Sequence, residues 1–166
     1  MASALNAFTK LGKAKGESTQ APYADWIELQ AWEWEVEAET SWTKGGGASV
    51  GKPNPGKMTI LHYFDTSSTV MLGFICTGKA FPKGEIQVMK TTGKGVPETY
   101  LTITVEGVFI TKVSNSLNED GVVNQLVEFV FKTIKIEYKP QNKDGSLGAS
   151  RTFNWDIPAG TASPTA

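Results

Sequence analysis

WIELQAWEWEVEAE, residues Trp26–Glu39, is the stretch that decides the fold class. Apolar side chains alternate with polar ones along it, as they do on a strand that buries one face. The apolar positions change parity once: they are Ile27, Leu29 and Ala31, and then Trp32, Trp34, Val36 and Ala38. Because a shift of one residue moves every following side chain to the other face, we expect a long strand with a bulge or sharp coil.

Two further stretches change face in the same way. In Tyr100–Val113 the regular alternation is interrupted at Gly107, where we expect a barrel corner. In Val127–Tyr138 the apolar positions change parity between Phe131 and Ile134. Three long strands that each change face favour closure over a flat sheet. The predicted fold is therefore mostly β, a small closed β-barrel.

One segment carries the signals of a helix instead. Asp65 is a good N-cap, apolar residues follow at helical spacing, and Gly78 stands where a left-handed C-cap would fall. The sequence thus predicts one short α-helix over about residues 66–77, closing one side or one end of the barrel. Shorter strands are expected at residues 7–11, 57–64, 85–91 and 151–157. We expect a single domain over residues 1–157 and a disordered tail over residues 158–166.

The segment after the second strand, residues 39–57, is predicted to be a long loop. It has four glycines before Lys52 and two prolines after it. Long loops without secondary structure are uncommon in compact domains, and they are usually functional or disordered. Trp42 lies in its middle and favours docking, because a free loop would leave that large apolar ring in water.

Composition restricts the classes of partner. The 166 residues carry 16 Lys and Arg against 17 Asp and Glu, a formal net charge of −1, so we expect no nucleic-acid partner. The longest apolar run, Val70–Cys76, has seven residues, whereas a membrane span needs about 20. The first residues lack the apolar core of a signal peptide. We therefore expect a protein made in the cytoplasm, without membrane insertion and without an ordinary export signal.

Few residues offer catalytic or metal-binding chemistry. The single cysteine, Cys76, excludes an internal disulfide, and the single histidine, His62, excludes a multi-histidine metal site. We expect His62 to be a buried or interface residue with one hydrogen bond, and Cys76 to fill the core with an unactivated thiol. No nucleophile, base and orienting group come together in the sequence. We therefore expect no enzymatic activity, no cofactor and no metal.

Four glutamates alternate along the second predicted strand and form what we call the acidic ladder: Glu33, Glu35, Glu37 and Glu39. Neighbours of such a ladder lie about 7 Å apart on one face, a spacing that also occurs between the acids of glycosidases. An outward face, however, offers no apolar pocket to raise the pKa of one carboxyl group. We favour a solvated face, or a face toward a lysine-bearing partner, over a cation site or catalysis.

Two other patterns have ordinary explanations. Residues 46–52 and 51–57 match the phosphate-binding spacing GxxxxGK, but Pro53 and Met58 stand where a Ser or Thr must hold Mg²⁺. A flexible loop is the favoured interpretation. The five tryptophans could form a platform for sugars, but Trp32 and Trp34 share a face with core residues, which favours use in the core.

Several short motifs, taken in order, resemble one known family. They are Gly16-Glu17-Ser18; Trp26-Ile27-Glu28-Leu29 with Trp32 and Trp34; Phe64-Asp65 with Ser67 and Ser68; Cys76-Thr77-Gly78-Lys79; Tyr100-Leu101-Thr102-Ile103; and Phe131 with Ile136-Glu137-Tyr138-Lys139-Pro140-Gln141. Together they cover about residues 7–157. Their order, their spacing and the single helix resemble the Hcp family (haemolysin-coregulated protein), the tube protein of bacterial type VI secretion systems.

The resemblance implies an Hcp-like barrel, related to phage tail tubes, that assembles into a hexameric ring. Such rings stack into a hollow tube, which a contractile sheath drives into a target cell behind a spike (VgrG-like) protein, with effectors carried in or on it. A protein exported in this way is secreted without a signal peptide. A head-to-tail ring also repeats one heterologous interface, which would cover exposed strand edges.

The resemblance further implies that the long loop contacts the adjacent subunit or ring. Trp42, Val50 and Lys52 are the residues expected to make that contact. The acidic ladder would then lie on a ring interface or on the wall of the lumen.

Two alternative functions stay open at this point. A tail-tube subunit of a phage or another contractile injection particle would share the architecture. A monomeric β-barrel module that binds a carbohydrate or another small ligand would use the tryptophans as its platform. The second alternative predicts a monomer, whereas a tube protein predicts a ring.

Overall fold

The computed structural model describes residues 6–43 and 46–164. Its elements, in chain order, are β1 (Ala7–Leu11), β2 (Ile27–Glu33), β3 (Val36–Thr43), β4 (Gly47–Pro55), β5 (Met58–Tyr63), α1 (Thr66–Thr77), β6 (Ala80–Thr91), β7 (Pro97–Leu117), β8 (Val123–Val130), β9 (Thr133–Tyr138), β10 (Arg151–Asp156) and β11 (Thr161–Ser163). Among the described residues, no helix is both long and apolar enough to cross a membrane.

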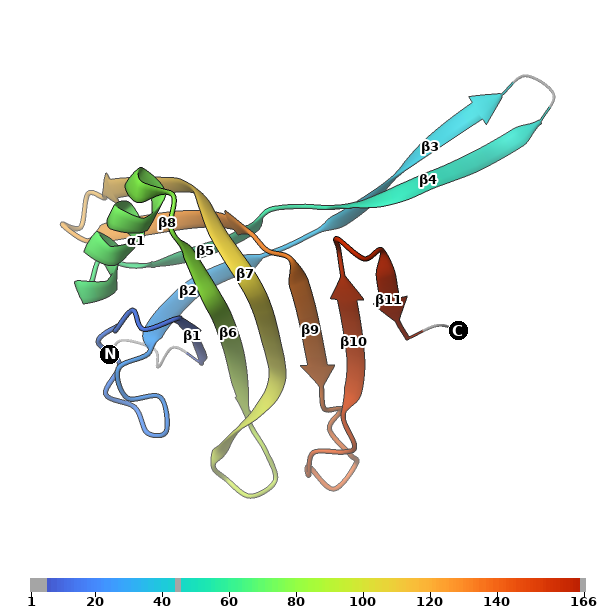
Figure 1. The fold of residues 1–166 in the computed structure, drawn as a ribbon. Helices are drawn as coiled ribbons and strands as arrows, with labels where there is room; N and C mark the ends of the chain where they lie inside the picture. The colour runs from blue at the N-terminus through green and yellow to red at the C-terminus, as the bar shows by residue number, and fades with distance from the viewer. Residues whose placement is uncertain (1–5, 44–45, 165–166) are drawn as a thin grey trace.

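Six antiparallel strands close into a barrel (Figure 1). Their order is β7, β6, β1, β2, β5 and β8, and a further pairing of β8 with β7 completes the ring. Strands β9, β10 and β11 continue the sheet beyond β7. The predicted fold class, a mostly β protein with a small closed barrel and a short helix, is confirmed.

The long strand β7 changes partner at Gly107. Residues Leu101–Glu106 pair with β9, and residues Phe109–Leu117 pair with β8. Gly107 lies between them with φ +63°, and a Cβ atom built there would lie 2.9 Å from Cδ of Lys132. The left-handed backbone favours glycine, and a Cβ atom would in addition displace the Lys132 side chain. The corner predicted at Gly107 is therefore the point where the strand leaves one partner for another.

Each parity change in the sequence marks an irregularity in the structure. In the pairing of β2 with β5, the register shifts between Leu29 and Ala31, which confirms the expected bulge. The chain is nevertheless not one long strand, because β2 ends at Glu33 and β3 begins at Val36 in a separate sheet. Val127–Tyr138 is likewise divided between β8 and β9.

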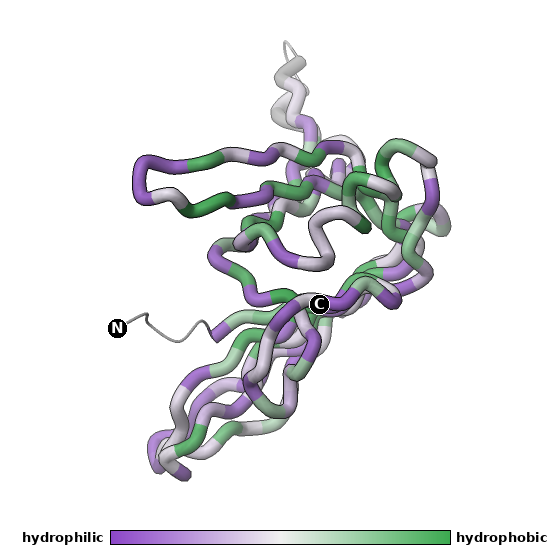
Figure 2. Tube along the Cα trace, turned by 90° about the vertical axis from the view of Figure 1, so that its left-hand side faces the viewer, coloured by the Kyte–Doolittle hydropathy of each residue, from purple (hydrophilic) through white to green (hydrophobic). Residues whose placement is uncertain are grey.

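The core fills the barrel with the inward half of each alternating strand, and Figure 2 shows hydrophilic and hydrophobic residues alternating along the chain. The largest fully buried apolar side chains of this core are Phe129, Leu11, Ile27, Met58, Ile60, Met71, Ile86, Ile103 and Ile134, and Phe8 is buried in a separate small cluster with Tyr23 and Met89. Helix α1 lies beside β7 (Figure 1) and contributes Met71 to this core. Phe74 of α1 stacks on Phe81 of β6, with 4.0 Å between ring centroids.

The helix has the predicted bounds because its signals are local. The Asp65 carboxylate accepts a hydrogen bond from the Ser67 N–H at 2.8 Å, and the Ser68 hydroxyl accepts one from the Asp65 N–H at 2.9 Å. This reciprocal capping box satisfies donors at the helix start. Gly78 ends the helix in the left-handed conformation, with φ +68°.

Two predictions about irregular segments are wrong. Residues 39–57 form most of a hairpin, β3 and β4, rather than a structureless loop. Part of the predicted disordered tail, Thr161–Ser163, is strand β11, which pairs with β10 from Asn154↔Ser163 to Asp156↔Thr161. In both cases the segment gains a partner for its backbone hydrogen bonds, and hydropathy alone does not reveal such a partner. Residues 165–166 lie outside the described part of the chain.

Candidate assembly site

The hairpin formed by β3 and β4 projects from the barrel as a separate two-stranded ribbon (Figure 1). Its pairing runs from Val36↔Pro55 at the base to Thr43↔Gly47 near the tip. Because β3 and β4 pair only with each other in the described structure, one edge of each strand is left without a partner. Free strand edges of this kind readily pair with another chain.

Trp34 anchors the base of the hairpin to the barrel. Its indole N–H donates to the carbonyl oxygen of Gly56 at 3.1 Å, and its ring lies 5.8 Å from that of Phe131. The Gly56 N–H donates to the carbonyl of Glu35 at 2.9 Å. A Cβ atom at Gly56 would lie 2.7 Å from the same carbonyl oxygen, so only glycine allows this approach. The ribbon therefore leaves the barrel at a fixed point.

Two of the three predicted contact residues present exposed side chains on the hairpin. Val50 is 71% exposed, the most exposed of the large apolar side chains described, and Lys52 is also exposed. Trp42 pairs through its backbone with Ala48, and its side chain lies outside the described part of the structure. A register shift between Ala38 and Thr40 places Gly51 and Lys52 opposite Glu39.

The acidic ladder extends over the end of β2 and the start of β3. Glu33, Glu35, Glu37 and Glu39 are all exposed. The alternating residues Trp32 and Trp34 pack against the core, so the neighbouring carboxylates point away from it. No group of three or more acidic, His or Cys side chains in the described structure could hold a metal ion. The geometry thus offers a row of solvated carboxylates.

The tryptophans with described side chains belong to the core. Trp155 is buried, Trp32 and Trp34 pack against the main cluster, and Trp26 packs against a smaller cluster around Tyr23. This arrangement confirms the predicted use of these rings. It leaves no open aromatic platform among them for a sugar to stack on. The GxxxxGK matches fall on the hairpin and the turn after it, and no helix follows either of them at once.

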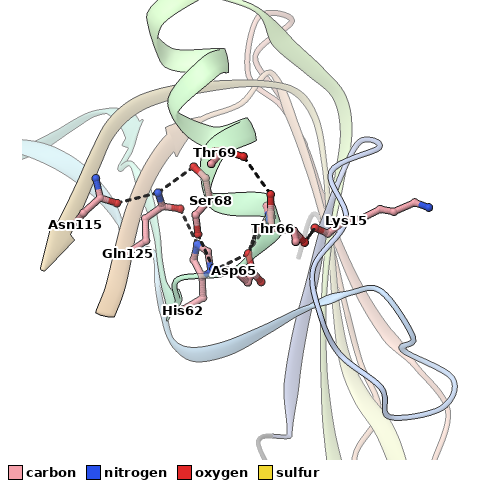
Figure 3. Close-up of polar contacts among 9 residues, drawn as sticks. Lys15, His62, Asp65, Thr66, Ser68, Thr69, Asn115 and Gln125 are labelled. Atoms are coloured by element: carbon pink, nitrogen blue, oxygen red, sulfur yellow. Dashed lines mark hydrogen bonds and ion pairs between the residues drawn. The ribbon is translucent and has the colours of Figure 1, made fainter. Parts of the chain in front are cut away.

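His62 lies in a row of polar side chains beneath α1 (Figure 3), in which His62 and Gln125 are buried and Asn115 is exposed. His62, Gln125 and Asn115 are cross-strand neighbours on β5, β8 and β7, where the barrel closes. The Gln125 amide group donates to Asn115 Oδ1 at 2.9 Å and to the Ser68 carbonyl at 3.2 Å. Gln125 Oε1 then accepts from His62 Nε2 at 2.9 Å. The expected buried histidine with one hydrogen bond is confirmed, and its role is to connect strands.

The prediction for Cys76 is wrong, because the residue is exposed. Met71, Phe74 and Ile75 form the side of α1 that packs on the core, and Cys76 follows on the next position around the helix. Successive helical residues lie about 100° apart, which turns Cys76 toward solvent. Sequence reasoning also overlooked Gln125 and a group of lysines at β1 and β6. Their partners are distant in the sequence, and only the run Lys10-Leu-Gly-Lys-Ala-Lys15 gave a local signal.

Comparison with known proteins agrees with this architecture. The family model described as type VI secretion system effector, Hcp, matches residues 8–138. Protein hcp1 of Pseudomonas aeruginosa is 31% identical over 157 residues, covering 93% of this chain and 96% of that protein. Hcp1 from Salmonella typhimurium has a TM-score of 0.78 at 26% identity, over 94% of this chain and 97% of that one. A structure described as a type six secretion system protein reaches a TM-score of 0.86 at 22% identity, over 96% and 100% of the two chains.

The family match covers most of the chain and agrees with the closed barrel, the single described helix and the ordered motifs noted in the sequence. The chain therefore belongs to the Hcp family, the tube proteins of the type VI secretion system.

Proposed function

We propose that this protein forms hexameric rings and that the rings stack into a hollow tube. A contractile sheath would propel the tube, a spike protein would tip it, and effectors would travel in or on it. The protein would be made in the cytoplasm and leave the cell through the apparatus. The single observation that carries the proposal is the projecting hairpin of β3 and β4. An isolated two-stranded hairpin is marginally stable in water, so a partner that covers it would stabilise it.

The partner surface on the hairpin is proposed to include Val50, Lys52 and Trp42. An aliphatic side chain that is 71% exposed gains free energy when a neighbouring subunit buries it. Lys52 can pair with a carboxylate of the neighbour. Trp42 is included because of its large apolar ring. The acidic ladder at the root of the hairpin would face either the same interface or the lumen.

The first test is the mass of the purified protein in solution, measured by light scattering. Six copies of the 17.9 kDa chain give about 107 kDa, the mass of one closed ring. Negative-stain microscopy of the same sample would then show stacked rings. A mass of 17.9 kDa over a wide range of concentration would contradict the proposal and favour a monomeric binding module.

The second test removes the hairpin without disturbing the barrel. Val36 and Pro55 pair at its base, so residues 37–54 can be replaced by the tight turn Asn-Gly. We expect the shortened chain to fold, because the core cluster does not include these residues, and to lose ring stacking. Val50→Asp should weaken assembly in the same direction. Val96→Asp, at an exposed position in the β6–β7 turn, is the matched control and should assemble normally.

A further inference from the structure

Four exposed lysines gather at β1, at the chain that follows it and at β6. We call Lys10, Lys13, Lys15 and Lys83 the lysine patch. They line two adjoining hollows of about 190 and 370 Å³, which share Lys10 and Gly12. Two carboxylates, Glu85 and Asp25, also line these hollows, so the ammonium groups outnumber the carboxylates by two.

The backbone beneath the lysine patch is held at several points. The Gly12 N–H donates to the Lys83 carbonyl at 2.8 Å, which ties the end of β1 to β6. The Thr66 hydroxyl donates to the Lys15 carbonyl at 2.8 Å, and the Lys15 side chain points away from the barrel (Figure 3). The Gly16 N–H donates to the Asp25 carbonyl at 2.8 Å. The backbone that carries the patch is therefore fixed, which lowers the backbone part of the entropy cost of binding.

Neither the lysine patch nor the acidic ladder is neutralised within the chain. In the described structure the ion pairs are Lys94 with Glu98, Lys135 with Glu137, and His62 with Asp65 at 3.9 Å. None of them includes a residue of the patch or of the ladder. A chain with a net charge of −1 thus keeps one surface with an excess of carboxylates, where Lys52 lies opposite Glu39, and one with an excess of lysines, beside Glu85 and Asp25.

The two surfaces also match in position and in spacing. Figure 1 shows β1 and the chain after it on the side of the barrel away from the hairpin. Such opposite placement suits a head-to-tail contact between copies. Glu37 and Glu39 alternate on β3 and so lie about 7 Å apart, whereas Glu33 ends β2 and Glu35 lies between the two strands. Lys10 is the register partner of Glu85 and so lies diagonal to Lys83 across β1 and β6, a separation of about 7–8 Å.

From this we infer that the acidic ladder of one copy docks on the lysine patch of a second copy. The inference rests on the proposed assembly and assigns a partner to each of the two charged surfaces. Complementary charge of this kind steers encounter, fixes orientation and disfavours wrong contacts.

Disulfide trapping tests the inference directly. In a Cys76→Ser background, one chain carries Glu37→Cys and another carries one cysteine in place of Lys10, Lys13, Lys15 or Lys83. We expect a linked dimer when the two chains are mixed and oxidised, and none from either chain alone. A chain that carries both cysteines should give a ladder of linked species. Glu119→Cys, in the β7–β8 turn, replaces Glu37→Cys in the control mixture and should give no dimer.

Charge reversal supplies an independent test. Glu35→Lys/Glu37→Lys and Lys10→Glu/Lys13→Glu should each raise the concentration needed for assembly by at least about tenfold. Combining the four substitutions should restore assembly, because the substituted positions of the ladder are then positive and those of the patch negative. Circular dichroism checks that each variant is folded.

The outcomes separate this inference from the proposed function. Wild-type rings or tubes with neither trapped dimers nor an effect of charge reversal would overturn the inference alone. A wild-type chain that does not assemble at all would overturn the proposed function as well.

Discussion

Nε2 of His62 lies 2.9 Å from Oε1 of Gln125, and both side chains are fully buried. Because the Gln125 amide group already donates to Asn115 and to the Ser68 carbonyl, Oε1 accepts and the imidazole must donate. The pair therefore holds the histidine in one tautomer. It also joins β5, β8 and the first turn of α1 at the seam of the barrel.

Replacing Gln125 should destabilise the barrel without changing its outer surface. Gln125→Leu leaves the buried His62 N–H and the Ser68 backbone carbonyl without their partner; the third partner, the side-chain oxygen of Asn115, belongs to an exposed residue that water can satisfy. Each buried polar group that loses its partner costs about 1–3 kcal/mol. We expect the free energy of unfolding to fall by at least about 2 kcal/mol in urea titrations at a fixed protein concentration.

Asn124→Ala is the matched control for Gln125→Leu. Asn124 is the adjacent residue on β8, and its side-chain oxygen, Oδ1, has no hydrogen-bond partner in the described structure. The two variants should differ clearly in stability. Equal stability would show that the row of polar side chains does not hold the strands together.

The capping box at Asp65 gives a second prediction, for the helix alone. Asp65→Ala removes the acceptor of the Ser67 N–H at the start of α1. Loss of an N-cap costs about 1 kcal/mol, whereas Asp65→Ser keeps an oxygen acceptor and should retain most of the stability. Hydrogen exchange of the amides in the first turn is the measurement, and equal protection in both variants would contradict the prediction.

Gly16 is expected to be intolerant of any side chain. A Cβ atom there would lie 2.4 Å from the Trp26 carbonyl oxygen and 2.6 Å from Ile27 Cα. Both are backbone atoms, so relieving the clash would require the backbone to move. Gly16→Ala should therefore lower the free energy of unfolding by more than about 2 kcal/mol or yield insoluble protein.

Gly73 supplies the control for that substitution. It lies in α1, and a Cβ atom added there would have no atom of a neighbouring element within 4 Å, so added bulk meets no obstacle. Gly73→Ala should be neutral or stabilise the protein by up to about 1 kcal/mol, because alanine favours a helix. Equal effects of the two changes in thermal unfolding would refute the packing argument for Gly16.

Asp144 gives a prediction about pH. The Ser146 hydroxyl and then the Ser146 N–H donate to its carboxylate, at 2.6 and 3.0 Å, and both bonds hold the pKa of Asp144 below its usual value. A folded-state pKa below the unfolded one contributes stability above the ordinary aspartate range, about pH 4, and this contribution is lost as pH falls through the folded value.

Ser146→Ala removes the larger of these two causes. We expect the pKa of Asp144 to rise toward the ordinary value, as followed by NMR titration of its side-chain carbon. Ser116→Ala, in the distant end of β7, should leave the titration curve unchanged. An unaltered curve in Ser146→Ala would show that the hydroxyl does not stabilise the carboxylate.

The loop that carries Asp144 is also tied to the β6–β7 turn, because the Gly93 N–H donates to the Gly145 carbonyl at 2.9 Å.

Local signals in the sequence determined much of the fold. The helix begins and ends as predicted because a cap and a left-handed glycine act within a few residues of each end. The parity changes near Ala31 and Gly107 mark places where strands bend or change partner, since side-chain direction follows residue number directly. The ordered motifs also indicated the family.

Tertiary structure decided what depends on pairing between distant segments. Residues 39–57 form most of a ribbon because β3 pairs with β4, and Thr161–Ser163 form a strand because β10 has an edge with which they can pair. Lys10 meets Lys83, and His62 meets Gln125, only through the register of the barrel. The alternation of apolar and polar residues predicts which face of the sheet a side chain occupies. Its cross-strand neighbour depends instead on which strands pair with each other. The pairing of strands is determined by packing of the whole core, so no local run of residues can predict it.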